Sequence, residues 1–250
     1  MPFSLKIGTL IIIAPTQANN PPRGIGQKTI DIIRGVAKAC KKSNCSLIGG
    51  ETAEMPNHYK GKNFDLAGFS VGIVEKKLII DSSKVRKNNI IIGIESSGAH
   101  SNGYSLINKL IRESKLTKSE KEKLTKLALK PTHLYTNVIL DLVKKVKVKS
   151  IANITGGGLL ENIPRSIPNT LSSEIYLKNW KMPQFFATLQ KLGKIEMSDM
   201  LRIFNCGIGM TVIIEPRELD STIKVLSKHK FKGFMIGKVI KKSSSAITFL

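Results

Sequence analysis

Cysteine is scarce in this sequence, which has only Cys40, Cys45 and Cys206 among its 250 residues. Three cysteines cannot pair completely into disulfides, and their spacing contains no Cys-x-x-Cys metal motif. Reduced thiols are the simplest interpretation, and they are typical of a cytoplasmic protein. We therefore expect no disulfide framework and a cytoplasmic location.

Histidine is also sparse, and several catalytic motifs are missing. The sequence has no His-Glu-x-x-His motif and no cluster of Cys and His, which argues against a zinc site. A Gly-x-Ser-x-Gly string occurs at 68–72, but apolar alternation there predicts a strand, so it does not indicate the strand-to-helix turn of a hydrolase nucleophile. The histidines are spread along the chain at His58, His100, His133 and His229.

Long apolar runs are absent, since no stretch approaches the roughly 20 residues that span a bilayer. We therefore expect no membrane partner. The run Ile7 to Ala14, between Lys6 and Thr16-Gln17-Ala18, weakly resembles a secretory signal. A buried strand explains its apolar centre equally well, and the single Lys before the run favours the strand.

Acidic residues are few, and so are arginine and aromatic residues. Forty Lys and Arg against 18 Asp and Glu give a formal charge of +22, but only 7 of the 40 basic residues are Arg. Nucleic-acid readers use Arg forks and aromatic stacking, whereas aromatics make up 6% of this chain. A basic nucleic-acid-binding protein therefore stays an alternative, and we consider nucleic acid an unlikely partner.

Apolar periodicity predicts strands and helices in mixed order, which places the chain in the α+β or α/β class. Helical spacing begins at Ile30 and Ile33, and the β-branched run Ile90–Ile94 predicts a fully buried strand. The lysine-rich segment from Glu113 to Lys130 predicts a solvated helix or an excursion. A polar loop near residues 81–88 predicts a boundary between two domains, 1–85 and 86–250.

The first of three glycine-rich segments, Gly49-Gly50-Glu51-Thr52-Ala53-Glu54-Met55-Pro56, is predicted to be a turn that carries carboxylates. A carboxylate after a glycine turn can hold Mg²⁺ against nucleotide phosphates. Glu51 and Glu54 could equally be solvated acids or charges at a helix N-terminus. The residues alone favour neither of these two interpretations.

Two further segments follow predicted strands. Residues 96–103, Ser-Ser-Gly-Ala-His-Ser-Asn-Gly, concentrate small polar groups that suit a phosphate or polar substrate at a sheet edge. A plain surface turn is the weaker alternative. Thr155-Gly156-Gly157-Gly158, between a strand and a helix, has the pattern of an anion-binding nest.

Read together, these segments resemble a known family. Three further motifs belong with them: Asp-Leu-Ala-Gly-Phe-Ser-Val-Gly at 65–72, Leu-Leu-Glu-Asn-Ile-Pro-Arg at 159–165, and Phe-Asn-Cys-Gly-Ile-Gly-Met at 204–210. In this order, from about Thr29 to the C-terminus, the motifs are similar to those of aminoimidazole ribonucleotide synthetases, also called phosphoribosylformylglycinamidine cyclo-ligases. The Ser-Gly-x-His-Ser-Asn-Gly string favours this family over related kinases and synthetases.

The resemblance implies an enzyme that uses ATP and Mg²⁺ to close formylglycinamidine ribonucleotide into aminoimidazole ribonucleotide, the fifth step of purine synthesis. It implies a homodimer with a ferredoxin-like half that contributes to a shared barrel, followed by an α/β domain. The family motifs place Glu51 at the metal, and Gly49, Gly50, Glu51 and Asp65 at the nucleotide. They place His100 and Asn205 among catalytic residues, and the following at the substrate: Ser97, Gly98, Ser101, Asn102, Gly103, Thr155, Gly156, Gly157, Gly158 and Asn162.

The sequence departs from the family at its front. It contains no Asp-Gly-x-Gly-Thr-Lys motif and no following Asn-Asp pair, so we expect a chain truncated by roughly a quarter of the family length. Without those charges we expect weak nucleotide binding. The alternative to an active cyclo-ligase is therefore a remnant that binds substrate without turnover.

Overall fold

The computed structural model describes residues 3–14, 27–54 and 64–250. The chain divides into two compact units, Met1–Ile79 and Ile80–Leu250, and each is described by itself. Val85, which our sequence boundary assigned to the first domain, is 1% exposed in the core of the second unit.

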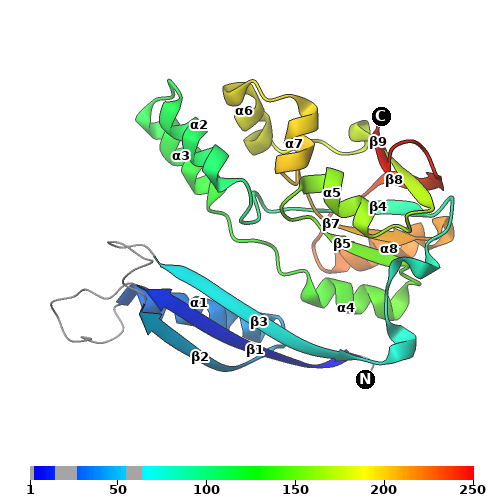
Figure 1. Ribbon diagram of the computed structural model, residues 1–250, viewed down its shortest axis with the longest axis horizontal. Coiled ribbons are helices and arrows are strands. Elements are labelled where there is room, and N and C mark those ends of the chain that lie inside the picture. The colour runs from blue at the N-terminus through cyan, green and yellow to red at the C-terminus, as the bar shows by residue number, and fades with distance from the viewer. Residues whose placement is uncertain (1–2, 15–26, 55–63) are drawn as a thin grey trace. The chain divides into compact units, whose positions relative to one another are not determined.

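The described residues of the first unit form a three-stranded sheet and one α-helix (Figure 1). The central strand β1 (Phe3–Ala14) pairs in parallel with β2 (Ser46–Glu54) and antiparallel with β3 (Asp65–Val74). Parallel neighbours need a crossover, and helix α1 (Gln27–Lys42) provides it. The strand interpretation of the apolar run near the N-terminus is therefore confirmed.

The prediction of a glycine turn at Gly49-Gly50-Glu51 is wrong. The three residues lie inside β2, where they pair with Thr9, Leu10 and Ile11 of β1. A Gly-Gly pair normally indicates a turn, but here the backbone hydrogen bonds to β1 keep both glycines extended. The neighbouring Met55 and Pro56 lie outside the described residues.

The second unit is built on a six-stranded sheet in the order β5-β7-β4-β8-β6-β9. All neighbours are antiparallel except β6 and β9. Its strands are β4 (Ile90–Glu95), β5 (Ser150–Asn153), β6 (Leu171–Ile175), β7 (Ile208–Ile214), β8 (Gly233–Lys241) and β9 (Ile247–Phe249).

Helices connect these strands. They are α2 (Tyr104–Glu113), α3 (Lys118–Ala128), α4 (Thr136–Lys145), α5 (Gly158–Arg165), α6 (Gln184–Gly193), α7 (Met197–Ile203) and α8 (Leu219–Lys228). Short 3-10 turns lie at Lys76–Leu78, Ser82–Lys84, Leu177–Asn179 and Pro216–Glu218.

Both faces of the six-stranded sheet are covered, which explains why β4 is apolar from Ile90 to Ile94 (Figure 1). Ile91 points into a core shared with α2, α3, α5, α6 and α7. Ile92 and Ile94 point to the opposite face, into a core shared with α4 and α8. The predicted mixed α/β class is confirmed, and no described helix is both long and apolar enough to cross a membrane.

The lysine-rich segment forms helix α3, as one of the two predictions stated. Thr117 accepts a hydrogen bond from the Glu120 N–H, and the Glu120 carboxylate accepts one from the Thr117 N–H at 2.8 Å. This capping box fixes the start of the helix. Leu124 and Ala128 anchor its inner side in the core, so α3 is solvated on its outer side only.

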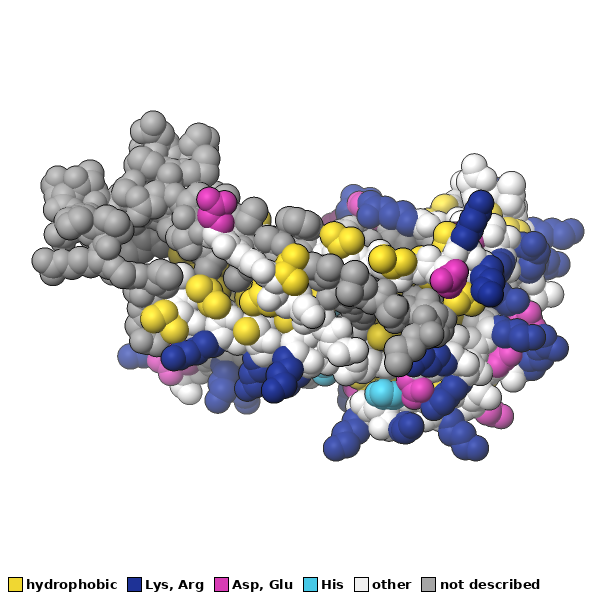
Figure 2. Space-filling model, turned by 90° about the horizontal axis from the view of Figure 1, so that it is seen from below, with side chains coloured by type: hydrophobic (Ala, Val, Ile, Leu, Met, Phe, Trp, Pro, Cys, Tyr) yellow, Lys and Arg dark blue, Asp and Glu magenta, His cyan; other side chains and the backbone are white. Residues whose placement is uncertain are grey.

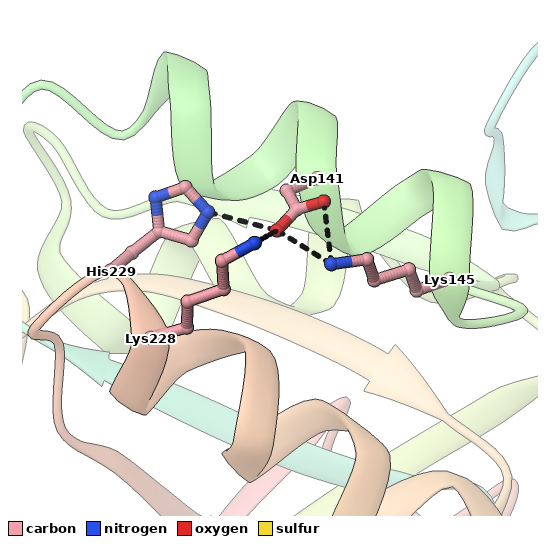
Figure 3. Close-up of polar contacts among 4 residues, drawn as sticks. All are labelled: Asp141, Lys145, Lys228 and His229. Atoms are coloured by element: carbon pink, nitrogen blue, oxygen red, sulfur yellow. Dashed lines mark hydrogen bonds and ion pairs between the residues drawn. The ribbon is translucent and has the colours of Figure 1, made fainter.

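Helices α4 and α8 are joined by a charged cluster around Asp141 (Figure 3). The His229 Nε2 lies 3.0 Å from Asp141 Oδ2, and the Lys145 Nζ lies 3.0 Å from Oδ1. Hydrogen bonds from His229 and then Lys145 lower the pKa of the Asp141 carboxyl. The carboxylate is therefore more stable in the folded chain than in the unfolded chain.

We expect Asp141→Asn to lower the free energy of unfolding at pH 7 by less than about 1 kcal/mol, because such exposed pairs are weak. A lowered folded pKa stabilises above the unfolded value of about 3.9, and this contribution disappears as the pH falls through the folded pKa. The difference from wild type should therefore shrink in acid. Urea unfolding at pH 7 and at about pH 2.5 measures it, with Glu122→Gln on α3 as the control, and a difference that grows in acid contradicts the assignment.

Candidate functional site

The segment 96–103 leaves the end of β4 and enters α2. Gly98, Ala99 and His100 are buried, so the segment is not a plain surface turn. Gly103 precedes α2 with a φ of 76°, and a side chain there would collide with the ring of Phe204. Glycine is therefore required at this position for both conformation and space.

The His100 side chain points inward. It is 6% exposed, and its Nε2 accepts a hydrogen bond from the Ser97 N–H at 3.0 Å. The Ser97 Oγ lies 2.9 Å from the same nitrogen and donates to the Pro131 carbonyl at 2.6 Å. His100 thus ties the beginning of the segment to the chain that leads into α4.

Burial also controls the charge of this imidazole. Desolvation, followed by the charge of His133, lowers the pKa of His100 to about 4. The His100 ring packs edge-on against His133 and Tyr135, with ring centroids 6.0 Å away in both contacts. The ring is therefore neutral at pH 7 and accepts a hydrogen bond through Nε2.

Asn205 joins two segments that are far apart in the sequence. Its Nδ2 donates to the Gly98 carbonyl at 2.7 Å, and its Oδ1 accepts from the Ser96 hydroxyl at 2.8 Å. The same Oδ1 accepts from the Gly207 N–H at 2.9 Å, and the residue is 3% exposed. Asn205 is thus a buried connection between the segment 96–103 and the turn before β7.

The glycine turn 155–158 opens α5, as the sequence predicted. Gly157 and Gly158 have left-handed φ values of 88° and 55°. The Asn162 Nδ2 donates to the Gly156 carbonyl at 3.0 Å and the Gly158 carbonyl at 2.8 Å. Asn162 is 6% exposed, so its amide holds the turn from inside.

A carboxylate of this chain lies directly over the turn. The Glu161 side chain packs against Gly157, and its Oε2 pairs with Arg165 at 3.2 Å. The space above Gly157 is therefore faced by a negative charge as well as by the N-terminus of α5. Any anion at this turn would have to compete with Glu161.

The three segments of the second unit lie side by side. Gly158 packs against the backbone of Leu201 and Phe204, and Gly156 lies near the Asn102 Oδ1. The Asn102 Nδ2 donates to the His100 carbonyl at 2.6 Å. Ser101, Thr155 and Gly156 are exposed, whereas His100, Asn162 and Asn205 are turned inward. Segments 96–103, 155–158 and 204–207 are therefore in contact with one another within the second unit.

The proposed nucleotide and metal residues belong to the first unit. Gly49, Gly50 and Glu51 lie on β2, and Asp65 begins β3. Because β1 lies between β2 and β3, the backbone of Glu51 and the backbone of Asp65 are about 10 Å apart or more. Among the described residues there is no group of three His, Cys, Asp or Glu side chains that could hold a metal. The assignment of Glu51 to the metal stays a prediction.

Two residues received no role in the sequence analysis, although Ser96 lies within the segment 96–103. The Ser96 hydroxyl donates a hydrogen bond to the Asn205 Oδ1. The Tyr135 hydroxyl donates one to the Glu95 carbonyl at 2.6 Å, next to the start of the segment. Burial raises the pKa of Tyr135, which keeps this donor protonated. The only local signal was the position of Ser96 directly after a buried strand.

Two family models match this chain. The C-terminal domain of AIR synthase related proteins matches residues 86–249, and the N-terminal domain matches residues 8–74. The similarity thus begins about twenty residues before Thr29, where we expected it to start. The phosphoribosylformylglycinamidine cyclo-ligase of Acetivibrio thermocellus is 43% identical over 219 residues, covering 86% of this chain and 64% of the relative. That of Bacillus cytotoxicus is 42% identical over 221 residues, with the same two coverages.

Solved structures share the fold at low identity. The hydrogenase maturation protein HypE of E. coli gives a TM-score of 0.68 at 15% identity, covering 97% of this chain and 69% of HypE. Thiamine monophosphate kinase of Aquifex aeolicus gives 0.61 at 14% identity, covering 98% and 74%. The chain spans about 64% of the length of the two cyclo-ligases above. With both domains matched and the motif segments in contact, this chain belongs to the AIR synthase related family.

Proposed function

We propose that this chain takes part in the ATP-dependent closure of formylglycinamidine ribonucleotide to aminoimidazole ribonucleotide. The relatives that are 41 to 43% identical carry the name of this cyclo-ligase. The single observation that carries the proposal is the contact of segments 96–103, 155–158 and 204–207 in one unit. These are the segments that carry the family motifs.

The exposed groups of the segments suit the uncharged polar parts of the ribonucleotide, its sugar hydroxyls and amide nitrogens. Ser101 and Thr155 offer hydroxyls, and Asn102 offers an amide oxygen beside Gly156. Glycines let the ligand approach the backbone N–H groups closely. This chain would thus bind and orient the ribonucleotide, which is the main task of the protein in phosphoryl transfer.

ATP would supply the phosphoryl group that converts the formyl oxygen into a leaving group. The ring-closing nitrogen then forms the new C–N bond, and ADP and phosphate are released. Glu51 would be the residue to hold Mg²⁺ against the nucleotide phosphates, and we derive no step through the metal. The family expectation for Gly49, Gly50, Glu51 and Asp65 stays a prediction.

The test is binding and turnover with the purified chain. We expect formylglycinamidine ribonucleotide to bind in isothermal titration calorimetry, and a coupled ADP assay to report turnover. Binding without ADP release identifies the remnant that was the alternative, and absence of binding contradicts the proposal. Ser101→Ala should weaken binding about tenfold, whereas Ser105→Ala, at an exposed position of α2, should not change it.

We also propose that the first unit forms a homodimer through its sheet, as the ferredoxin-like half of the family would. Apolar side chains of β2 and β3 are exposed: Ile48 and Ile73 at 62%, Val71 at 50% and Leu66 at 48%. Hydrophobic side chains are visible at the surface in Figure 2. Such exposed apolar groups are typical of an interaction surface.

Light scattering after size exclusion tests this proposal. We expect twice the 27.5 kDa chain mass, and a monomer for Val71→Asp. Lys76→Asp, which follows the strand, controls for added negative charge and should stay dimeric. A monomeric wild type contradicts the dimer.

The free thiols of Cys40, Cys45 and Cys206 support our further proposal of a cytoplasmic location.

A further inference from the structure

We propose that His100 and Asn205 are positioning residues, which hold the segment 96–103 in shape so that Ser101 and Asn102 face the ligand. The family motifs had suggested catalytic roles for both side chains. The identity of the ligand rests on the proposed function, but the positioning itself does not.

The hydrogen bonds of Asn205 leave it little capacity for a ligand. A side-chain amide can donate two hydrogen bonds and accept two. Asn205 accepts from Ser96 and Gly207 and donates to Gly98, all within 2.9 Å. At 3% exposure, the residue spends both acceptor positions and one donor on its own chain. It therefore acts on a ligand only through the segment that it holds.

His100 is equally enclosed. Its Nε2 faces Ser97, and its ring lies so close to Gly209 that a side chain at Gly209 would overlap it. His133 and Tyr135 cover the ring at centroid distances of 6.0 Å. A group surrounded in this way cannot reach a substrate without unpacking the segment.

The backbone of the segment explains why it needs to be held. His100 and Ser101 are consecutive residues with left-handed φ values of 51° and 60°. Non-glycine residues adopt this conformation only when the surrounding structure imposes it. The bonds from His100 to Ser97 and from Asn205 to Gly98 lie on the N-terminal side of this pair, and they counteract the strain. Ser101 is consequently exposed, and Asn102 is fixed through its bond to the His100 carbonyl.

Hydrogen exchange of the backbone amides in 96–103 tests the proposal. We expect His100→Ala and Asn205→Ala to speed exchange about tenfold in this segment, because each leaves buried groups unpaired. His100→Gln keeps an acceptor for the Ser97 N–H and should restore most of the protection. Asn205→Asp keeps the hydrogen bonds that Oδ1 accepts from Ser96 and Gly207, but it replaces the donor to the Gly98 carbonyl by a carboxylate oxygen. We therefore expect faster exchange around Gly98, while the Gly207 amide stays protected.

Ligand affinity separates the two groups of residues. Ser101→Ala should weaken ribonucleotide binding but leave the hydrogen exchange of the segment as in the wild type. His100→Ala should weaken binding and speed exchange, and His100→Gln should restore most of the binding and of the protection. Unchanged exchange in His100→Ala and Asn205→Ala overturns the proposal, and so does faster exchange in Ser101→Ala. If Asn205→Ala does not fold, Ser96→Ala removes only one of its bonds and takes its place. If the wild type fails to bind the ribonucleotide, the proposed function is wrong while the exchange result still decides the positioning.

Discussion

Gly158→Ala is expected to lower the free energy of unfolding of the second unit by about 3 kcal/mol. Gly158 has a φ of 55°, and its missing side chain would collide with the carbonyl oxygen of Leu201 and lie 2.8 Å from that of Phe204. Both obstacles are backbone atoms, which cannot rotate away. The residue thus combines left-handed strain with a collision. Thermal unfolding should show a melting temperature lower by about 10 °C.

Gly156→Ala is the matched control, two residues earlier in the same turn. The nearest atom to its added side chain would be the Asn102 Oδ1 at 3.7 Å, an ordinary contact distance. We expect a change in unfolding free energy of less than about 0.5 kcal/mol. Equal losses for the two variants would show that general turn flexibility, and not the close approach of α7, requires Gly158.

Phe204→Ala is expected to cost about 4 kcal/mol, the usual cost of emptying a large aromatic site in a core. The side chain of Phe204 is fully buried, and its ring lies 5.7 Å from that of Phe186. It also fills the space beside Gly103 at the start of α2. The loss should therefore destabilise the unit and loosen the segment 96–103 together.

Urea unfolding measures this loss, and Phe204→Leu separates volume from aromatic packing. Leucine retains most of the apolar volume, so we expect a cost below about 1.5 kcal/mol. A cost below about 1 kcal/mol for Phe204→Ala would contradict the packing that connects the three segments.

Local pattern was sufficient where a single element decides the structure. The β-branched run at Ile90–Ile94 is a strand, and the triple glycine at Gly156–Gly158 is a turn that opens a helix. Thr117 and Glu120 carry a capping box that could also have been predicted, since its signal spans only four residues.

Long-range pairing decided what local pattern could not. Gly49 and Gly50 have the composition of a turn, yet they are extended because β1 pairs with them across the α1 crossover. The burial of Val85 in the second unit has a similar cause. Val85 is buried by elements that come much later in the chain.

The amino-acid sequence by itself determined the family, the mixed α/β class and the segments of the candidate site. Only the tertiary structure decided which side chains of those segments face inward. The direction of His100 depends on Ser97 and on rings from the entry to α4, and that of Asn205 depends on Gly98. Partners over a hundred residues apart, such as Asn205 and Gly98, are selected by packing and hydrogen bonding in the folded unit, so no local pattern could report them.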